Sequence, residues 1–239
     1  MFEELDYCKT SLGELILRRR SVPGMDDVCL YEVTLDGEFL MSSLVNDSEI
    51  ALADLAMAEL GGRECDVLVG GLGLGHTAQA VLAFDNVKSL VVAEFLPEVI
   101  RWHQRGLTPL GAELTGDDRC RLVRADFFAL ADTGFDSGSD EDVPSMYDAI
   151  IVDIDHSPLS LLDTGHAAFY DPPGMARLAK HIAPDGVFAL WSADPPNDAF
   201  MDSLRTSFHA VRAEVIKFFN PIVDSTHTNT IYLARRKNS

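Results

Sequence analysis

A glycine run that follows a short apolar segment is the first pattern in the sequence with a chemical meaning. The apolar residues Val67–Val69 lead into Gly71-Leu-Gly73-Leu-Gly75, and a helix-forming segment follows. Glycines at a turn from strand to helix let the backbone bend sharply and approach a ligand closely. The spacing of Gly71, Gly73 and Gly75 fits a loop of the S-adenosylmethionine type better than a dinucleotide loop. A tight glycine turn without a ligand is the alternative.

Two carboxylates come next, each at the end of a later apolar segment. Glu94 ends Ser-Leu-Val-Val-Ala-Glu, where a carboxylate can accept hydrogen bonds from both hydroxyls of a ribose. Asp126 follows Arg-Leu-Val-Arg-Ala and can accept a hydrogen bond from the exocyclic amine of adenine, with Phe127 beside the ring. These residues and Phe95 form the predicted nucleoside site. An ordinary strand-end acid at Glu94 and a helix N-cap at Asp126 are the structural alternatives.

The segment Asp153-Ile-Asp155-His156 ends a further apolar run, Tyr147–Val152. Ligands of open α/β sheets bind beyond the carboxyl ends of the strands, so Asp153 is expected to share a crevice with Glu94. A carboxylate there can take a proton from an attacking amine. Asp153 is therefore the predicted base, and Asp155 or His156 would orient the nucleophile. A loop histidine without a catalytic role is the alternative for His156, and no other histidine has the spacing of a metal ligand, so no metal is expected.

Strands and helices alternate from Cys65 onward, which predicts a parallel sheet covered on both faces. The expected strands are short and apolar: Asp66–Val69, Ser89–Ala93, Arg121–Ala125, Tyr147–Val152 and Gly186–Trp191. Val211–Phe219 and Thr230–Ala234 are expected as strands added at one edge. Before this region, residues 12–43 favour β structure with a hairpin turn at Asp36-Gly37, and Asn46-Asp47-Ser48 offers N-cap oxygens to a helix.

The predicted fold class is α/β: a Rossmann-like, class I S-adenosylmethionine-dependent methyltransferase fold preceded by a small β-hairpin module. The module covers residues 1–47, and the nucleoside-binding domain covers residues 48–239. Asp132–Ser145 is polar, acidic and rich in glycine and serine, which predicts a solvated, mobile loop.

Charge and composition limit the classes of partner. The net charge of −19 repels a phosphate backbone, so a nucleic-acid partner is not expected, and small cationic molecules fit better. The N-terminus is acidic and no apolar run has the length of a membrane span, so a cytoplasmic protein without a membrane partner is expected. The scattered cysteines predict reduced thiols: Cys8, Cys29, Cys65 and Cys120.

The order of these features resembles the spermidine synthase (polyamine aminopropyltransferase) family, from about Leu12 to Arg236. The matching segments are the Leu35-Asp-Gly turn, the glycine loop, Glu94 with Pro97-Glu-Val-Ile, Asp126, the Tyr147–Asp153 segment, Phe169-Tyr170 and Ala183-Pro-Asp-Gly186. The resemblance implies an N-terminal strand module before a Rossmann-like domain, and a homodimer. It also implies that Glu94 holds the ribose, Asp126 the adenine, and that Asp153 is the base.

The sequence departs from the family mainly at the second-substrate positions. Gly73 stands where the family has an aspartate that helps to hold the amine of the aminopropyl group. His156 stands where the family has a second catalytic-loop aspartate. Leu52-Ala53-Asp54 aligns with a Tyr-His-Glu run of the polyamine pocket, and Met41 lies near the place of a family glutamine. The nucleoside half therefore matches, whereas the polyamine half has diverged.

Three functions remain open at this stage. The first is transfer of an aminopropyl or related alkyl group from decarboxylated S-adenosylmethionine to a small cationic amine. The second is methyl transfer from intact S-adenosylmethionine, which the loss of an acid at Gly73 favours. The third is a non-catalytic nucleoside-binding protein. Fold analogy alone does not decide among them.

Overall fold

A small antiparallel sheet forms the N-terminal part of the chain. The computed structural model describes residues 1–22, 24–135 and 144–237. Its first four strands pair in sequence order: β1 (Phe2–Thr10), β2 (Gly13–Val22), β3 (Met25–Leu35) and β4 (Glu38–Ser42). Asp36 and Gly37 have φ of 51° and 80°, which confirms the predicted two-residue hairpin turn. The strand β1 is an addition that the sequence pattern did not indicate.

A seven-stranded sheet forms the larger part. Its strands are β5 (Cys65–Gly70), β6 (Val87–Glu94), β7 (Cys120–Arg124), β8 (Tyr147–Val152), β9 (Ile182–Ser192), β10 (Phe208–Asn220) and β11 (Ser225–Arg236). They are ordered β10-β11-β9-β8-β5-β6-β7. The strands β5 to β9 are parallel, whereas β11 pairs antiparallel with β9 and β10 antiparallel with β11. The predicted parallel sheet with two added edge strands is confirmed.

Helices cover both faces of this sheet, as the apolar strands require. They are α1 (Asp47–Glu59), α2 (His76–Leu82), α3 (Pro97–Gln104), α4 (Gly111–Gly116), α5 (Phe127–Thr133), α6 (Pro172–Leu178) and α7 (Asp198–Ser207), with 3-10 turns at Thr164–Phe169 and Ala179–His181. Val67 and Val69 of β5 belong to the core under α1 to α4, while Leu68 belongs to the core under α5 to α7. No helix among the described residues has the length and apolar character needed to cross a bilayer.

The predicted loop Asp132–Ser145 is only partly a loop. Helix α5 continues through Asp132 to Thr133, and Phe135 is 3% exposed because its ring packs against Phe127 and Tyr147. Phe135 therefore belongs to the hydrophobic core. Residues 136–143, on which most of that prediction falls, lie outside the described residues.

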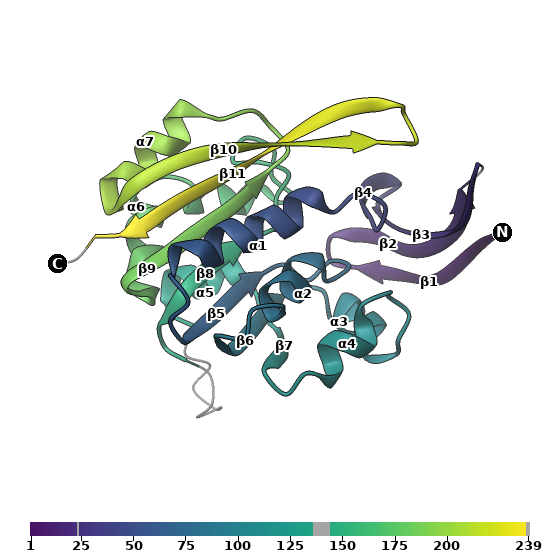
Figure 1. Ribbon diagram of the computed structural model, residues 1–239, viewed down its shortest axis with the longest axis horizontal. Coiled ribbons are helices and arrows are strands. Elements are labelled where there is room, and N and C mark those ends of the chain that lie inside the picture. Colours follow the sequence, from purple (N-terminus) through teal and green to yellow (C-terminus); the bar gives the residue numbers. More distant parts are fainter. Residues whose placement is uncertain (23, 136–143, 238–239) are drawn as a thin grey trace.

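The N-terminal sheet lies at one end of the large sheet, beside α2 and α3 (Figure 1). Leu15, Leu17 and Val33 are buried in the same core as α1 and α3. The indole Nε1 of Trp102 on α3 donates a hydrogen bond to Oδ2 of Asp6 on β1, at 2.7 Å. The two sheets thus share one hydrophobic core and a polar link.

Candidate active site

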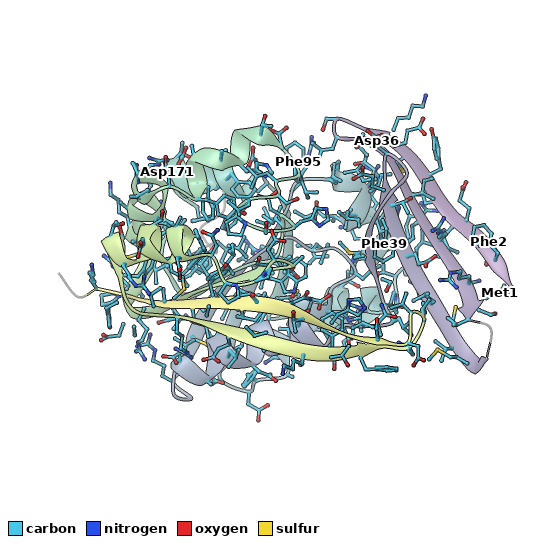
Figure 2. All side chains as sticks on the ribbon, turned by 90° about the horizontal axis from the view of Figure 1, so that it is seen from above. Met1, Phe2, Asp36, Phe39, Phe95 and Asp171 are labelled. Carbon is cyan, nitrogen blue, oxygen red and sulfur yellow. The ribbon has the colours of Figure 1, made fainter. Side chains whose placement is uncertain are left out.

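A cavity of about 420 Å³ lies between the carboxyl ends of the central strands and the N-terminal sheet. Four strand ends contribute to its wall: Gly71 and Gly73 after β5, Glu94 at the end of β6, Asp126 after β7, and Asp153 after β8. Residues that are far apart in the sequence are thereby brought to one cavity, as the rule for parallel strand ends requires. Figure 2 shows Phe95, another lining residue, at the border between the two parts of the molecule.

The glycine loop is held by contacts that leave no room for side chains. A Cβ on Gly71 would lie 2.1 Å from the backbone oxygen of Asp153, so the loop runs directly against the end of β8. The carbonyl oxygen of Gly73 is 2.9 Å from Nε2 of His103, a buried histidine on α3 that the sequence analysis missed. Gly75 precedes α2 and packs against Leu114, outside the lining residues.

Gly73 faces a sulfur atom of the N-terminal sheet. Its φ is +48°, and a Cβ at this position would lie 2.7 Å from Sδ of Met41 on β4. A side chain at position 73 would therefore be strained by the backbone and would collide with Met41. Position 73 thus carries glycine instead of the aspartate expected from the resemblance, and the apolar side chain of Met41 fills the space that a side chain at position 73 would need.

Glu94 is buried; it accepts a hydrogen bond from the glycine loop and also lines the cavity. Its Oε2 accepts a hydrogen bond from the amide of Leu72 at 3.0 Å, and its Oε1 accepts one from the amide of Leu96 at 2.7 Å. Burial raises the pKa of Glu94, and backbone N–H groups, first that of Leu96, oppose this rise. Because each carboxylate oxygen has two acceptor positions, Glu94 can still accept from ribose hydroxyls.

Asp126 is the N-cap of α5 and also borders the cavity. Its Oδ1 accepts a hydrogen bond from the amide of Ala129 at 3.1 Å, as the N-cap of α5, and the residue lines the cavity. Phe127 borders the cavity too, but its side chain is only 2% exposed and packs edge-to-face on Phe169. The next residue, Phe128, stacks on His166 with ring centroids 3.8 Å apart. Phe128 and His166 both line the cavity and were missed by the sequence analysis.

Asp153 has a second carboxylate nearby. Its Oδ2 accepts a hydrogen bond from Oγ1 of Thr77 at 2.7 Å. Burial raises the pKa of Asp153, and the Thr77 hydroxyl opposes this. Glu49 on α1 has a pKa raised to about 7, first by burial and then by the negative charge of Asp153. Two acids from distant segments therefore interact, and protonation of one favours ionisation of the other.

A polar chain fixes the position of Glu49. Nε1 of Trp191 and Nδ2 of Asn229 both donate to Oγ of Ser48, at 2.9 and 2.8 Å, and this hydroxyl donates to Oε2 of Glu49 at 2.7 Å. No sequence motif marks this group, because its members come from α1, β9 and β11.

Asn46 stands at the N-cap position of α1, but its side chain makes no cap hydrogen bond. The predicted cap is corrected here, since the amide of Asn46 contacts Nδ1 of His76 instead, at 3.0 Å.

Asp155 lies behind the cavity wall. Its carboxylate accepts hydrogen bonds from the amide of Leu162 at 2.7 Å, from Nδ1 of His166 at 2.9 Å and from the hydroxyl of Tyr170 at 2.8 Å. Neither Asp155 nor His156 belongs to the lining residues, and the backbone oxygen of His156 accepts from the amide of Ala193. Their catalytic roles stay predictions, whereas the geometry shows Asp155 positioning His166.

Over residues 1–22, 24–135 and 144–237 there is no group of three histidine, cysteine, aspartate or glutamate residues placed to hold a metal ion.

Solved structures with the same fold include spermidine synthases. The spermidine synthase of Thermotoga maritima, and a spermidine synthase in complex with the transition-state analogue AdoDATO, each align with a TM-score of 0.71 at 18% identity. Each alignment covers 99% of this chain and 74% of the other. Human methyltransferase-like protein 13 in complex with SAH aligns with a TM-score of 0.54 at 19% identity, covering 78% of this chain and 82% of the other.

A putative methyltransferase from Thermoplasma acidophilum aligns with a TM-score of 0.50 at 20% identity, covering 74% of this chain and 70% of the other. No protein-family model matches the chain, and no curated protein matches it. The chain thus has the class I S-adenosylmethionine-dependent methyltransferase fold, and it is spermidine-synthase-like in carrying an N-terminal antiparallel sheet before that fold.

Proposed function

We propose that the protein transfers an alkyl group from an adenosyl sulfonium donor, decarboxylated S-adenosylmethionine, to an amine. The observation that carries the proposal is the charge of the cavity. Five carboxylate residues line it: Glu94, Asp126, Asp132, Asp153 and Asp163. Among the described lining residues there is no lysine or arginine. In a site partly shielded from water, such a set of charges favours a cationic donor and a cationic acceptor.

The same charges support the decarboxylated donor over the intact one. Intact S-adenosylmethionine carries a carboxylate, which needs a cation or several hydrogen-bond donors when it leaves water. The wall near Gly73 offers the side chain of Met41 instead. The decarboxylated donor has no such group, and its positive charges match the acids of the cavity.

The reaction needs positioning and one proton acceptor. The cationic acceptor first gives a proton to Asp153, which frees the lone pair of its amino group. The lone pair forms a bond to the donor carbon next to sulfur, the C–S bond breaks, and its electron pair stays on sulfur as a neutral thioether. The product leaves as a secondary ammonium, and Asp153 returns its proton to water. Burial raises the pKa of Asp153, which makes its carboxylate a stronger base than an exposed aspartate.

The remaining groups hold the nucleoside. Glu94 would accept hydrogen bonds from the ribose hydroxyls, and Asp126 would accept one from the adenine amine. Phe128 and His166 provide stacked rings at this end of the cavity. Holding both reactants in line is the larger part of the rate gain that such a site can give.

Methyl transfer from intact S-adenosylmethionine is the second candidate. The observation in its favour is Gly73, where no acid is present to neutralise the amine of an aminopropyl group. Methyltransferases are also among the solved structures of this fold.

Isothermal titration separates the two candidates. The titrants are decarboxylated and intact S-adenosylmethionine, followed by measurement of methylthioadenosine or S-adenosylhomocysteine released in the presence of amines. We expect the decarboxylated donor to bind at least tenfold more tightly and methylthioadenosine to form. Tighter binding of the intact donor would replace the proposal with methyl transfer, and binding without either product would indicate a non-catalytic protein.

A further inference from the structure

The wall of the cavity that faces the strand ends is built by the N-terminal sheet. It contributes six side chains, and all of them are apolar: Leu12, Leu15, Val33, Leu35, Leu40 and Met41. They come from the β1–β2 turn, β2, β3 and β4. The charged side chains of the cavity all lie on the opposite wall or beside the nucleoside end. The cavity is therefore divided into an acidic half and an apolar half.

Met41 closes the apolar half toward the glycine loop. Its Sδ would be 2.7 Å and its Cε 2.8 Å from a Cβ at Gly73. The thioether is thus in contact with the loop, in the space that a side chain from the loop would need. A thioether is a weak acceptor and cannot neutralise an ammonium group.

Trp102 on α3 supports the same surface. It lines the cavity, and its indole N–H, the one polar group of the side chain, donates to Oδ2 of Asp6 at 2.7 Å. The ring is only 1% exposed, so it lies behind the apolar wall and supports it. Val99, on the same helix, adds a further apolar side chain.

We propose that the acceptor is an amine with an apolar body and a single amino group, such as a long-chain alkylamine or aralkylamine. Its chain would lie under the N-terminal sheet, against Leu35, Leu40 and Met41, and its amino group would reach Asp153. This inference rests on the proposed function for the reaction at the amine. A second ammonium at the far end of the acceptor would be buried among these side chains without a partner, which is strongly unfavourable.

Paired ligands of equal length test the inference. Hexylamine and 1,6-diaminohexane are titrated by calorimetry into the full-length protein saturated with methylthioadenosine. We expect hexylamine to bind at least tenfold more tightly, and butylamine to octylamine to gain about fourfold per added CH₂. Equal or tighter binding of the diamine, or no binding of hexylamine, would overturn the inference.

A carboxylate introduced into the apolar half tests the acceptor preference independently. Met41→Glu supplies a partner for a second ammonium, so the preference is expected to move at least tenfold toward the diamine. Phe39→Glu is the matched control, because Phe39 lies on the same strand but is 56% exposed and does not line the cavity. If Met41→Glu leaves the preference unchanged in a folded protein, or Phe39→Glu changes it equally, the apolar half does not select the acceptor.

Turnover distinguishes this inference from the proposed function. Release of methylthioadenosine from decarboxylated S-adenosylmethionine is measured with each of the two amines. If hexylamine binds preferentially but neither amine reacts, the proposed reaction is wrong, whereas the inference that the apolar half selects the acceptor is supported. If the diamine reacts with the higher kcat/KM, the reaction stands and the inference about the acceptor fails.

Discussion

Nδ1 of His166 lies 2.9 Å from Oδ1 of Asp155. A carboxylate has no hydrogen to give, so Nδ1 is the donor in this pair. In the neutral imidazole, Nε2 then carries a lone pair and can only accept. With a neutral ring, Asp155 thus fixes what kind of group His166 would recognise at the end of the cavity where we propose that the nucleoside binds. Adenine, with its exocyclic amine, suits an acceptor, whereas hypoxanthine, with a carbonyl at the same position, does not.

Asp155→Ala is expected to weaken this preference. The variant removes the oxygen that holds the ring hydrogen on Nδ1, so the hydrogen can move to Nε2 and turn that atom into a donor. One reversed hydrogen bond is worth about 1–3 kcal/mol, so we expect the preference for methylthioadenosine over methylthioinosine to fall by roughly tenfold. Calorimetry gives the two dissociation constants, and ¹⁵N NMR of the imidazole reports the tautomer.

The control for this prediction is Tyr170→Phe. It removes another donor to Asp155, at 2.8 Å, but keeps the carboxylate. The purine preference and the tautomer should stay as in the native protein. A shift of preference in Tyr170→Phe as large as that in Asp155→Ala would mean that loosening of the loop, and not the tautomer, is responsible.

Asp153→Asn should retain the nucleoside and lose turnover. The amide cannot accept the proton of the ammonium, and removing a general base costs about 10²–10⁴ in kcat. We expect the affinity for methylthioadenosine to change by less than about threefold, because that interaction does not use the proton. Asp132→Asn is the comparison, since Asp132 also lines the cavity but pairs with Arg177 at 2.6 Å. Full turnover by Asp153→Asn would remove this residue from the mechanism.

The native enzyme should also lose activity as the pH falls through the raised pKa of Asp153. Its base form is the ionised carboxylate, and burial shifts the midpoint above the ordinary range of an aspartate. Since Glu49 interacts with the same proton, Glu49→Gln removes a negative charge and should move the acidic limb of the kcat/KM profile to lower pH. An unmoved limb would show that the two acids do not interact during catalysis.

Glu49 should make folding stability fall between about pH 4.5 and pH 7. Its pKa is raised from the ordinary 4.5 to about 7, so in this window the native state binds more protons than the unfolded state. Stability is then greatest below the window and declines as the pH rises through it, by up to about 3 kcal/mol. Glu49→Gln should flatten this part of a Tm-against-pH curve. Asp54→Asn, at an exposed position of the same helix that does not contribute to the raised pKa of Glu49, should leave the slope as it is.

Gly73→Ala should be more costly than a glycine substitution at a comparable backbone angle. Gly61 has a φ of +64° with no atom within 4 Å of a built Cβ, whereas Gly73 has a φ of +48° and meets Met41. We expect Gly61→Ala to cost about 1–2 kcal/mol of unfolding free energy from urea denaturation, and Gly73→Ala about 0.5–1 kcal/mol more, because the atoms that must shift are the flexible end of the Met41 side chain. In a Met41→Ala background the extra cost of Gly73→Ala should disappear. Its persistence there would mean that Met41 is not the cause.

The ends of the parallel strands were predictable because each one is marked by the residues next to it in the sequence. A buried parallel strand is a short apolar run, and its first polar residue or glycine marks its carboxyl end. Gly71, Glu94, Asp126 and Asp153 were therefore found, and the topology of the sheet brings them together. The second acid was not predictable in this way. Glu49 lies in a helix with no distinguishing neighbour, and only its contacts through Ser48, from Trp191 and Asn229, fix its place.

The orientation of two adjacent aromatic residues was likewise not predictable from the sequence. Phe127 and Phe128 begin the same helix, and the sequence does not say which ring faces a ligand. The structure turns Phe127 toward Gly70 and the core, which leaves Phe128 for the cavity. Likewise, Asp155 was expected at the reacting atoms because it lies two residues after Asp153. The loop curls back over it, so its carboxylate is used by Leu162, His166 and Tyr170.

The two walls of the cavity belong to different sheets joined by a short stretch of chain before α1. Residues of β3 and β4 can therefore be exchanged without altering the strand ends themselves, provided that position 41 still fits Gly73 and position 33 still fits the shared core. Grafting the β3–β4 hairpin of a related structure onto this scaffold should transplant acceptor choice while leaving donor affinity intact. If so, the acceptor selectivity of this fold can change, in evolution or by engineering, through replacement of a single hairpin.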